Sequence, residues 1–145
     1  MLTVVQRVTE ARVEIDKQIV GAIQQGLVIL CGFAPEDTPL TLQCMLDKCL
    51  NYRIFSDAHG KMNLSLKQIN GGLLLVPQFT LLADTTRGLR PSFSKGASAE
   101  HGQGLFEQLL QLAEQQFSTV ACGRFAADMQ VHLCHDGPVT FVLSF

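Results

Sequence analysis

The apolar positions of this chain form unbroken runs in some places and helical stripes in others. The stretch Leu73–Asp84 begins as an apolar run, carries Gln78, Phe79 and Thr80 in its second half, and leads into a polar segment. This pattern predicts a buried strand that delivers side chains to a site at its end, because sites are commonly built where a strand meets a loop. A second apolar run, Leu27–Cys31, predicts another strand that is covered on both faces.

Two stretches have the apolar spacing of helices. Thr38 followed by Pro39 predicts a helix start, and the stripe behind it consists of Leu42, Met45, Leu46, Cys49 and Leu50. Ser98 predicts the start of a second helix, with Glu100 in its first turn, where the helix dipole favours an acid. Its apolar stripe consists of Leu105, Phe106, Leu109, Leu110, Ala113 and Phe117.

The remaining segments predict strands. We expect an opening hairpin from residues 2–15 and 19–23, a short strand at 52–55, a strand at 125–133 and a closing strand at 139–143. About seven or eight strands and two helices, without regular alternation, favour the α+β class. We therefore predict a single domain over residues 1–145, in which two main helices pack on a mixed or barrel-like β-sheet.

Composition narrows the classes of partner. The chain is 47% hydrophobic and 17% charged, with a net charge of -2, which fits an ordinary globular protein and argues against a general DNA or RNA binder. Five cysteines without CxxC spacing indicate reduced, packing thiols. No apolar segment approaches the length that spans a bilayer. We expect a cytoplasmic protein that uses neither membrane nor DNA.

Thr80 is the candidate hydroxyl at the end of the strand that begins at Leu73. As a nucleophile it would need an activating base, and no histidine has a recognisable triad spacing to it. It could instead be a β-branched strand residue that satisfies backbone groups, or it could hydrogen bond a substrate or water, which we prefer. In a regular strand Gln78 shares its face, so this face either lines a polar pocket or reaches solvent.

Three other groups of residues could carry chemistry. His132, Cys134 and His135 resemble a metal cluster, but no second ligand pair exists, so we expect no bound metal and no cofactor. The Gly137-Pro138 bond is predicted to be trans on sequence alone. The basic residues near the candidate site form either a solvated loop or a patch that contacts phosphate; they are Arg87, Arg90, Lys95 and Arg124.

Two motifs resemble those of the D-aminoacyl-tRNA deacylases. Residues 77–83, Pro-Gln-Phe-Thr-Leu-Leu-Ala, resemble the family's Ser-Gln-Phe-Thr-Leu-x-Ala, and residues 136–140, Asp-Gly-Pro-Val-Thr, resemble most of Asn-x-Gly-Pro-Val-Thr. Residues 6–8, 51–57, 61–64, 90–98 and 123–131 are also similar to that family. The resemblance spans essentially the whole chain.

The resemblance implies a homodimer that hydrolyses the ester between a D-amino acid, or glycine mischarged on tRNA-Ala, and the 3′ adenosine of tRNA, with the tRNA 2′-hydroxyl assisting. It implies that a cis Gly137-Pro138 enters the partner subunit's pocket and leaves an L side chain no room. It also implies roles for further residues. Gln78, Phe79 and Thr80 would orient the ester; Ala83, Met129, Val139 and Thr140 would help to bind the substrate; and Arg87, Arg90 and Lys95 would meet the acceptor end.

The sequence departs from the family at two positions next to these motifs. Pro77 replaces the usual serine and removes an N–H group, and His135 replaces the usual asparagine. We expect activity to survive because residues 78–83 and 137–140 keep the motifs. Two rival hypotheses remain: a catalytically impaired tRNA-binding module of the same fold, and an esterase that uses Thr80 as its nucleophile.

Overall fold

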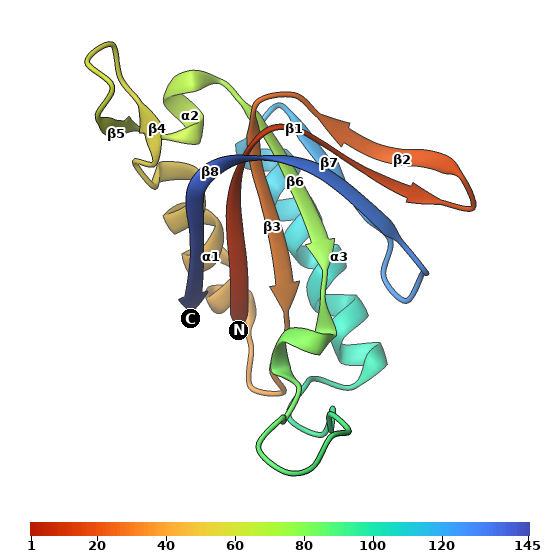
Figure 1. The fold of residues 1–145 in the computed structure, drawn as a ribbon. Helices are drawn as coiled ribbons and strands as arrows, with labels where there is room; N and C mark the ends of the chain where they lie inside the picture. The colour runs from red at the N-terminus through yellow and green to blue at the C-terminus, as the bar shows by residue number, and fades with distance from the viewer.

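The computed structural model describes residues 1–145 and is built around a six-stranded mixed sheet (Figure 1). Neighbouring strands follow the order β2-β1-β3-β6-β7, and β8 pairs with β1. The strands of this sheet are β1 (Leu2–Ile15), β2 (Gln18–Ile23), β3 (Gly26–Gly32), β6 (Gly72–Pro77), β7 (Val120–Cys122) and β8 (Gln130–Ser144). The two-stranded hairpin of β4 (Phe55–Ser56) and β5 (Met62–Leu64) projects from one corner.

The sheet mixes parallel and antiparallel pairs. β1 is antiparallel to β2, β3 and β8, whereas β6 is parallel to β3 and to β7. A parallel pair needs a crossover connection, and the two long helices, α1 (Pro39–Asn51) and α3 (Ala99–Gln116), lie in these crossovers. Figure 1 shows both helices on one side of the sheet. The predicted α+β class, with two main helices on a mixed, barrel-like sheet, is confirmed.

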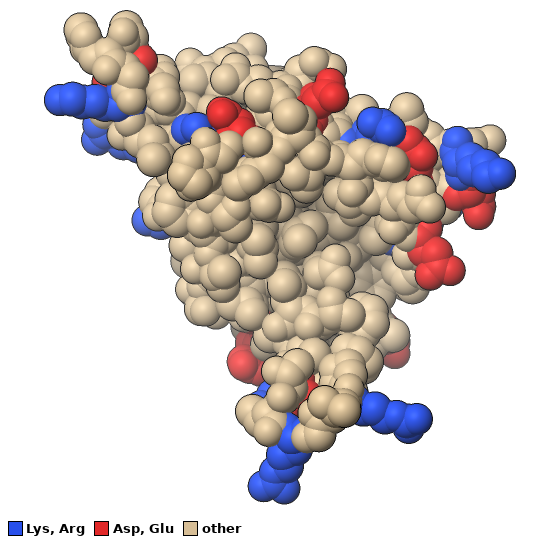
Figure 2. Space-filling model, viewed as in Figure 1, with Lys and Arg blue, Asp and Glu red and all other residues tan.

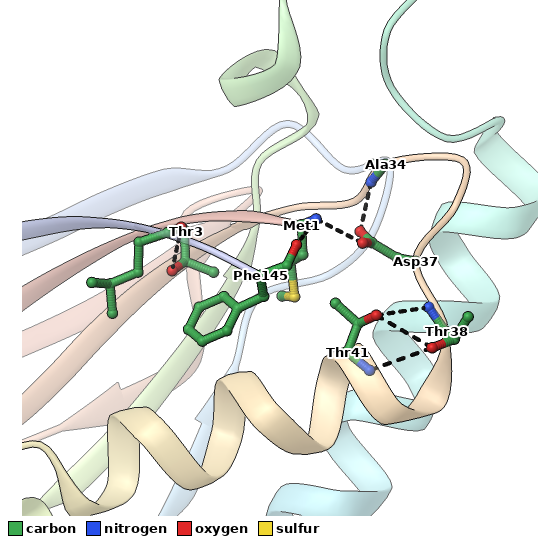
Figure 3. A network of polar contacts seen from close by, with 8 residues as sticks. Met1, Thr3, Ala34, Asp37, Thr38, Thr41 and Phe145 are labelled. Carbon is green, nitrogen blue, oxygen red and sulfur yellow. Dashed lines mark hydrogen bonds and ion pairs between the residues drawn. The ribbon is translucent and has the colours of Figure 1, made fainter.

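Both helices begin where the sequence predicted. At the start of α1 the Thr38 hydroxyl accepts a hydrogen bond from the Thr41 N–H, and the Thr41 hydroxyl accepts one from the Thr38 N–H (Figure 3). At the start of α3 the Ser98 hydroxyl accepts a hydrogen bond from the N–H of His101. The five apolar stripe residues predicted for α1 are all buried, so this face covers the sheet.

β6 is buried along its whole length because it is covered on both sides. Leu73 and Leu75 belong to the larger core between the sheet and the helices. Leu74 and Val76 belong to a smaller core on the opposite face of the sheet. The other members of the smaller core are Val8, Ala11, Val13, Ile23 and Val28. The strand predicted to be buried is therefore central to both cores.

The two chain ends meet next to the start of α1 (Figure 3). The ammonium group of Met1 lies 2.6 Å from a carboxylate oxygen of Asp37, and both groups are almost fully buried. Asp37 also accepts a hydrogen bond from the Ala34 N–H, and the Phe145 N–H donates to the Met1 carbonyl. This pairing compensates the cost of burying the Asp37 charge. None of the helices has both the length and the apolar character required to cross a membrane.

Several predicted element boundaries are wrong. The strand predicted to end at Thr80 ends at Pro77 and is followed by a 3-10 helix, η1 (Phe79–Leu82), so alternation does not place Gln78 and Thr80 on one strand face. The strand expected at 52–55 starts only at Phe55, and the one expected at 125–133 starts at Gln130. β8 runs through the predicted turn at 135–138 without a break, and the short helix α2 (Leu66–Ile69) was not predicted.

Candidate functional site

The chain turns sharply at the end of β6 and leaves polar side chains at the surface. Pro77 is the last strand residue and has no N–H, but the N–H of Gln78 donates to the Cys31 carbonyl at 2.7 Å and so keeps the chain attached to β3. η1 follows at once. The Gln78 side-chain amide then donates to the Thr80 hydroxyl oxygen at 2.6 Å. The two polar residues predicted to act together are therefore adjacent, although through a helical turn rather than through strand alternation.

A cavity of about 440 Å³ opens beside this corner. Gln78 and Phe79 line one side, and Ala127 and Met129, from the segment between β7 and β8, line another. Ten of its fourteen lining residues are hydrophobic, which suits an apolar amino acid side chain with a few polar groups to orient it. Phe79 and Phe93 are exposed, and their rings meet edge to face at 5.0 Å.

Met129 is fixed in this cavity by its neighbours. Its sulfur accepts a hydrogen bond from the Arg124 N–H at 3.3 Å. A Cβ atom on Gly123 would lie only 2.7 Å from that sulfur, so a residue without a side chain is needed at position 123 for Met129 to pack there. The Met129 side chain thus forms part of the cavity wall.

The Gly137-Pro138 segment lies elsewhere, as an exposed part of β8 that does not line the cavity of its own chain. The bond between the two residues is cis, as the resemblance implied and contrary to the expectation from sequence alone. The preceding Asp136 pairs with Arg7 of β1, whose Nε atom lies 2.8 Å from its carboxylate. Another nitrogen of Arg7 donates to the Ile54 carbonyl at 2.6 Å.

The two residues after Pro138 point in different directions. Val139 is 1% exposed and belongs to the larger hydrophobic core, so its side chain is not available to a substrate of this chain. Thr140 is exposed, and its hydroxyl lies 3.1 Å from the His135 ring and 3.2 Å from the Gln6 amide. Of the two predicted contact residues, only Thr140 has a side chain at the surface.

The basic loop between η1 and α3 is ordered around Asp84. Hydrogen bonds from the Thr86 hydroxyl and N–H, together with Lys95 at 3.0 Å, lower the pKa of Asp84 to about 2. Arg87 and Arg90 are exposed. Figure 2 shows basic side chains projecting at the end of the molecule where Figure 1 places this loop. Lys95 is thus committed to an ion pair, whereas the two arginines face solvent.

The two histidines considered as part of a metal cluster have separate partners. His132 lies 3.6 Å from Glu14, and the His135 ring contacts Val139 and Thr140. No group of three potential ligands comes together in the chain. A smaller hollow of about 220 Å³ next to His132 and Cys134 contains none of the predicted site residues. The predicted thiol packing holds for Cys31 and Cys49, which are buried, but not for Cys44 and Cys134, which are exposed.

The geometry defines what the site can do chemically. Gln78, Phe79 and Met129 line one cavity, Thr80 is hydrogen bonded to Gln78, and Ala83 follows directly after η1. No histidine or carboxylate hydrogen bonds the Thr80 hydroxyl, whose one side-chain partner is Gln78. The corner can therefore orient a carbonyl group or a water molecule, but it lacks the adjacent base that activates a hydroxyl nucleophile.

Sequence reasoning missed two residues of the cavity and one residue that anchors the Gly137-Pro138 segment. Phe93 and Phe125 line the cavity but carried no motif role. Arg7 occupies an inward position of β1, where Thr3 and Val5 before it are also buried. A charged residue in such an inward series is unusual unless it is paired, and that signal could have predicted a buried partner for Arg7.

Known proteins are similar to this chain over its full length or nearly so. The family described as D-Tyr-tRNA(Tyr) deacylase matches residues 4–144. A protein of Legionella pneumophila (strain Corby) named D-aminoacyl-tRNA deacylase is 64% identical over the full length of both chains. One of the same name from Pseudomonas fluorescens (strain Pf0-1) is 58% identical over 99% of each chain.

Two solved structures share the fold. One, described as c-Myc DNA Unwinding Element Binding Protein, has a TM-score of 0.95 at 36% identity and covers 100% of this chain and 99% of its own. The other, described as a probable eukaryotic D-amino acid tRNA deacylase, has a TM-score of 0.87 at 15% identity over 98% and 97% of the two chains, and supports the fold alone.

These matches place the chain in a class of hydrolases. It belongs to the D-Tyr-tRNA(Tyr) deacylase family. The family resemblance drawn from the two motifs, and the expectation of a deacylase enzyme, are confirmed.

Proposed function

We propose that this protein hydrolyses the ester bond of D-aminoacyl-tRNA and releases the free D-amino acid and tRNA. The observation that carries the proposal is the apolar cavity beside Gln78, Phe79 and Met129 in a chain that belongs to this family over its full length. The cavity would receive the aminoacyl group, and we include glycyl-tRNA as a substrate because glycine lacks a side chain that could be rejected. The expected location is the cytoplasm, where aminoacyl-tRNA is used.

The proposed reaction is positioning rather than nucleophilic catalysis by the protein. Water adds to the ester carbonyl carbon, and the bond to the ribose 3′-oxygen breaks. One proton of the water goes to that oxygen, which leaves as a hydroxyl group, and the other is released to solvent with the carboxylate product. The Gln78 amide, the Phe79 main chain and the Thr80 hydroxyl would orient the ester and stabilise charge on the carbonyl oxygen. The 2′-hydroxyl of the terminal ribose would assist proton transfer, because the site contains no titratable partner for Thr80.

Chiral selection is proposed to come from a second copy of the chain. Gly137 and Pro138 are exposed and lie outside the cavity of their own chain, so they are free to enter that of a partner. Main-chain carbonyl groups there would hold the α-amino group and leave no space for an L side chain, which is selection by steric exclusion.

An open face of the sheet supports the proposed homodimer. Figure 2 shows that the middle of this face lacks charged side chains, which gather at the corners of the molecule. Val142 of β8 is 65% exposed, and its neighbours across the β1 pairing, Val4 and Leu30, are only partly covered. A second copy of the chain would bury these apolar side chains.

The acceptor end of tRNA would reach the site along the basic loop. Arg87 and Arg90 are exposed and free to contact phosphates, while Lys95 would act from its ion pair with Asp84. The alternatives are a tRNA-binding module of this fold without turnover, and an esterase with Thr80 as nucleophile.

The test is deacylation of matched D-tyrosyl-tRNA and L-tyrosyl-tRNA by the purified protein, with glycyl-tRNA alongside and light scattering to measure the mass in solution. We expect release from the D-ester and glycyl ester, little release from the L-ester, and the mass of a dimer. A folded protein that binds these tRNAs without releasing the D-amino acid would support the binding-module alternative.

A further inference from the structure

The imidazole ring of His135 closes the segment that contains Gly137 and Pro138. Its Nε2 atom lies 3.1 Å from the Val139 carbonyl oxygen and 3.1 Å from the Thr140 hydroxyl oxygen. The side chain therefore reaches across the two exposed residues and bonds to the chain on their far side. Because a carbonyl oxygen only accepts hydrogen bonds, the contact with Val139 requires the hydrogen to be on Nε2.

The same ring also packs closely beside Gly137. A Cβ atom on Gly137 would lie 3.3 Å from both Cε1 and Nδ1 of the ring, so the ring packs against this glycine more closely than most side chains would permit. The ring is thus in contact with Gly137 and hydrogen bonded beyond Pro138. Movement of Gly137 or Pro138 relative to the rest of β8 would disturb these contacts.

Two neighbouring residues of β1 anchor this arrangement. The Gln6 amide donates to the Thr140 hydroxyl at 3.2 Å, which links the His135 contact to β1. Arg7, the next residue of β1, pairs with Asp136 at 2.8 Å. The residues on both sides of Gly137-Pro138 are therefore attached to one strand, and His135 is the side chain that spans the exposed pair itself.

We propose that His135 is a positioning residue for chiral selection, which rests on the function proposed above. By holding Gly137 and Pro138 in one orientation, it would fix the carbonyl groups that exclude an L side chain from the partner's cavity. Loss of the ring would let the segment shift and admit the L-ester, while hydrolysis of the D-ester, which depends on the Gln78 corner, would change much less. Residues that bind or exclude a substrate must be held in position by supporting contacts of this kind.

The test compares two substitutions of His135 with one control. His135→Leu removes the bonds to Val139 and Thr140, whereas His135→Gln keeps an amide N–H at about the position of Nε2. The control is His132→Leu on the same strand, because the His132 side chain is 40% exposed and contacts Glu14 instead. Rates of D-tyrosyl-tRNA and L-tyrosyl-tRNA hydrolysis are measured for each full-length variant, together with hydrogen exchange of the amides at 136–140.

We expect His135→Leu to lower the D-to-L rate ratio at least tenfold, mainly through faster hydrolysis of the L-ester, and to speed exchange at 136–140. His135→Gln should restore most of the ratio, and His132→Leu should leave both readouts unchanged. A selective wild-type enzyme whose ratio and exchange are unaltered in His135→Leu would overturn this inference alone. A wild-type enzyme without D preference would overturn the proposed function and the role of His135 with it.

Discussion

The two segments that carry the family motifs are held in place by different means. The corner at 78–82 is attached by a main-chain hydrogen bond from Gln78 to Cys31 and by one side-chain bond from Gln78 to Thr80. The segment at 135–140 is held by the ion pair of Asp136 with the buried Arg7 and by the bridging side chain of His135. Side-chain tethers are thus concentrated on the segment at 135–140 and not on the corner that contains Thr80.

The difference in tethering between the two segments matches the roles proposed for them. The corner that contains the Thr80 hydroxyl has no adjacent base, so it can orient the ester but cannot activate a nucleophile. An aminoacyl ester is already reactive, so its hydrolysis depends more on orientation than on a strong nucleophile. The tethered segment has the property that steric selection requires, because a surface that excludes one enantiomer must not yield to it. Variants in the two segments should therefore fail in different ways.

The largest expected effect is on the tethered segment. Arg7→Met should lower the free energy of unfolding by about 2–3 kcal/mol, because it leaves the Ile54 carbonyl and Asp136 without their partner. It should also reduce the preference for the D-ester. Urea denaturation measures the first effect, with Arg12→Met as the control. Arg12 is half exposed beside Glu14, so its loss should cost less than about 0.5 kcal/mol.

An Arg7→Met protein as stable as the wild type would contradict the difference in tethering between the segments at 78–82 and 135–140. It would mean that the segment at 135–140 does not depend on its anchor in β1. Equal losses for Arg7→Met and Arg12→Met would mean that burial of the Arg7 side chain does not matter.

At the untethered corner, we expect a smaller effect on stability and a limited effect on rate. Thr80→Ala removes an exposed hydroxyl whose partner is the Gln78 amide, so unfolding should change by less than about 0.5 kcal/mol. The rate of D-ester hydrolysis should fall no more than about tenfold, because the Gln78 amide and the Phe79 main chain still orient the ester and one neutral hydrogen bond contributes about 1 kcal/mol. Single-turnover kinetics measure this rate, and complete loss of turnover would favour the Thr80 nucleophile. Thr9→Ala, at an exposed position of β1, is the control.

The smallest expected effect concerns the basic loop. The Thr86 hydroxyl and N–H, with Lys95, hold the pKa of Asp84 near 2, below its ordinary value of 3.8. Because the folded pKa is depressed, this contribution to stability is present above pH 3.8 and is lost as the pH falls through about 2. Thr86→Val should raise the pKa of Asp84, as carboxyl chemical shifts in a pH titration would show.

Asp57 provides the internal control for that titration. Its pKa is lowered by hydrogen bonds from the main-chain N–H groups of Lys61 and His59, which are far along the chain from Thr86. It should stay lowered in Thr86→Val. A pKa of Asp84 that does not rise would mean that the Thr86 hydroxyl does not order this loop.

Sequence patterns predicted the elements that are governed by local chemistry. The starts of α1 and α3 were predictable because Thr38 and Ser98 cap them through hydrogen bonds to residues three positions ahead. The end of β6 was not, since the mostly apolar stretch Phe-Thr-Leu-Leu at 79–82 is compatible with a strand and with a short helix. Nor was the course of β8 through Gly137 and Pro138, because its pairing with β1 connects residues far apart in sequence.

The candidate site was predictable only in part for the same reason. The motif residues Gln78, Phe79 and Met129 do line one cavity. The partners of the other motif depend on contacts across the sheet: Arg7 with Asp136, and Gln6 with Thr140. A one-dimensional pattern could not show that neighbouring residues of β1 would hold both sides of Gly137-Pro138.

The most direct test is to remove the group that we propose transfers the proton, which is the 2′-hydroxyl of the terminal ribose. D-tyrosyl-tRNA ending in 2′-deoxyadenosine, esterified at its 3′-oxygen, is compared with the ordinary substrate in single-turnover hydrolysis by the wild type and by Thr80→Ala. We predict that loss of the 2′-hydroxyl slows the wild type by at least about 100-fold, the usual scale of acid–base assistance, whereas Thr80→Ala costs no more than about tenfold. A deoxy substrate hydrolysed at nearly the normal rate, together with an inactive Thr80→Ala enzyme, would contradict the account.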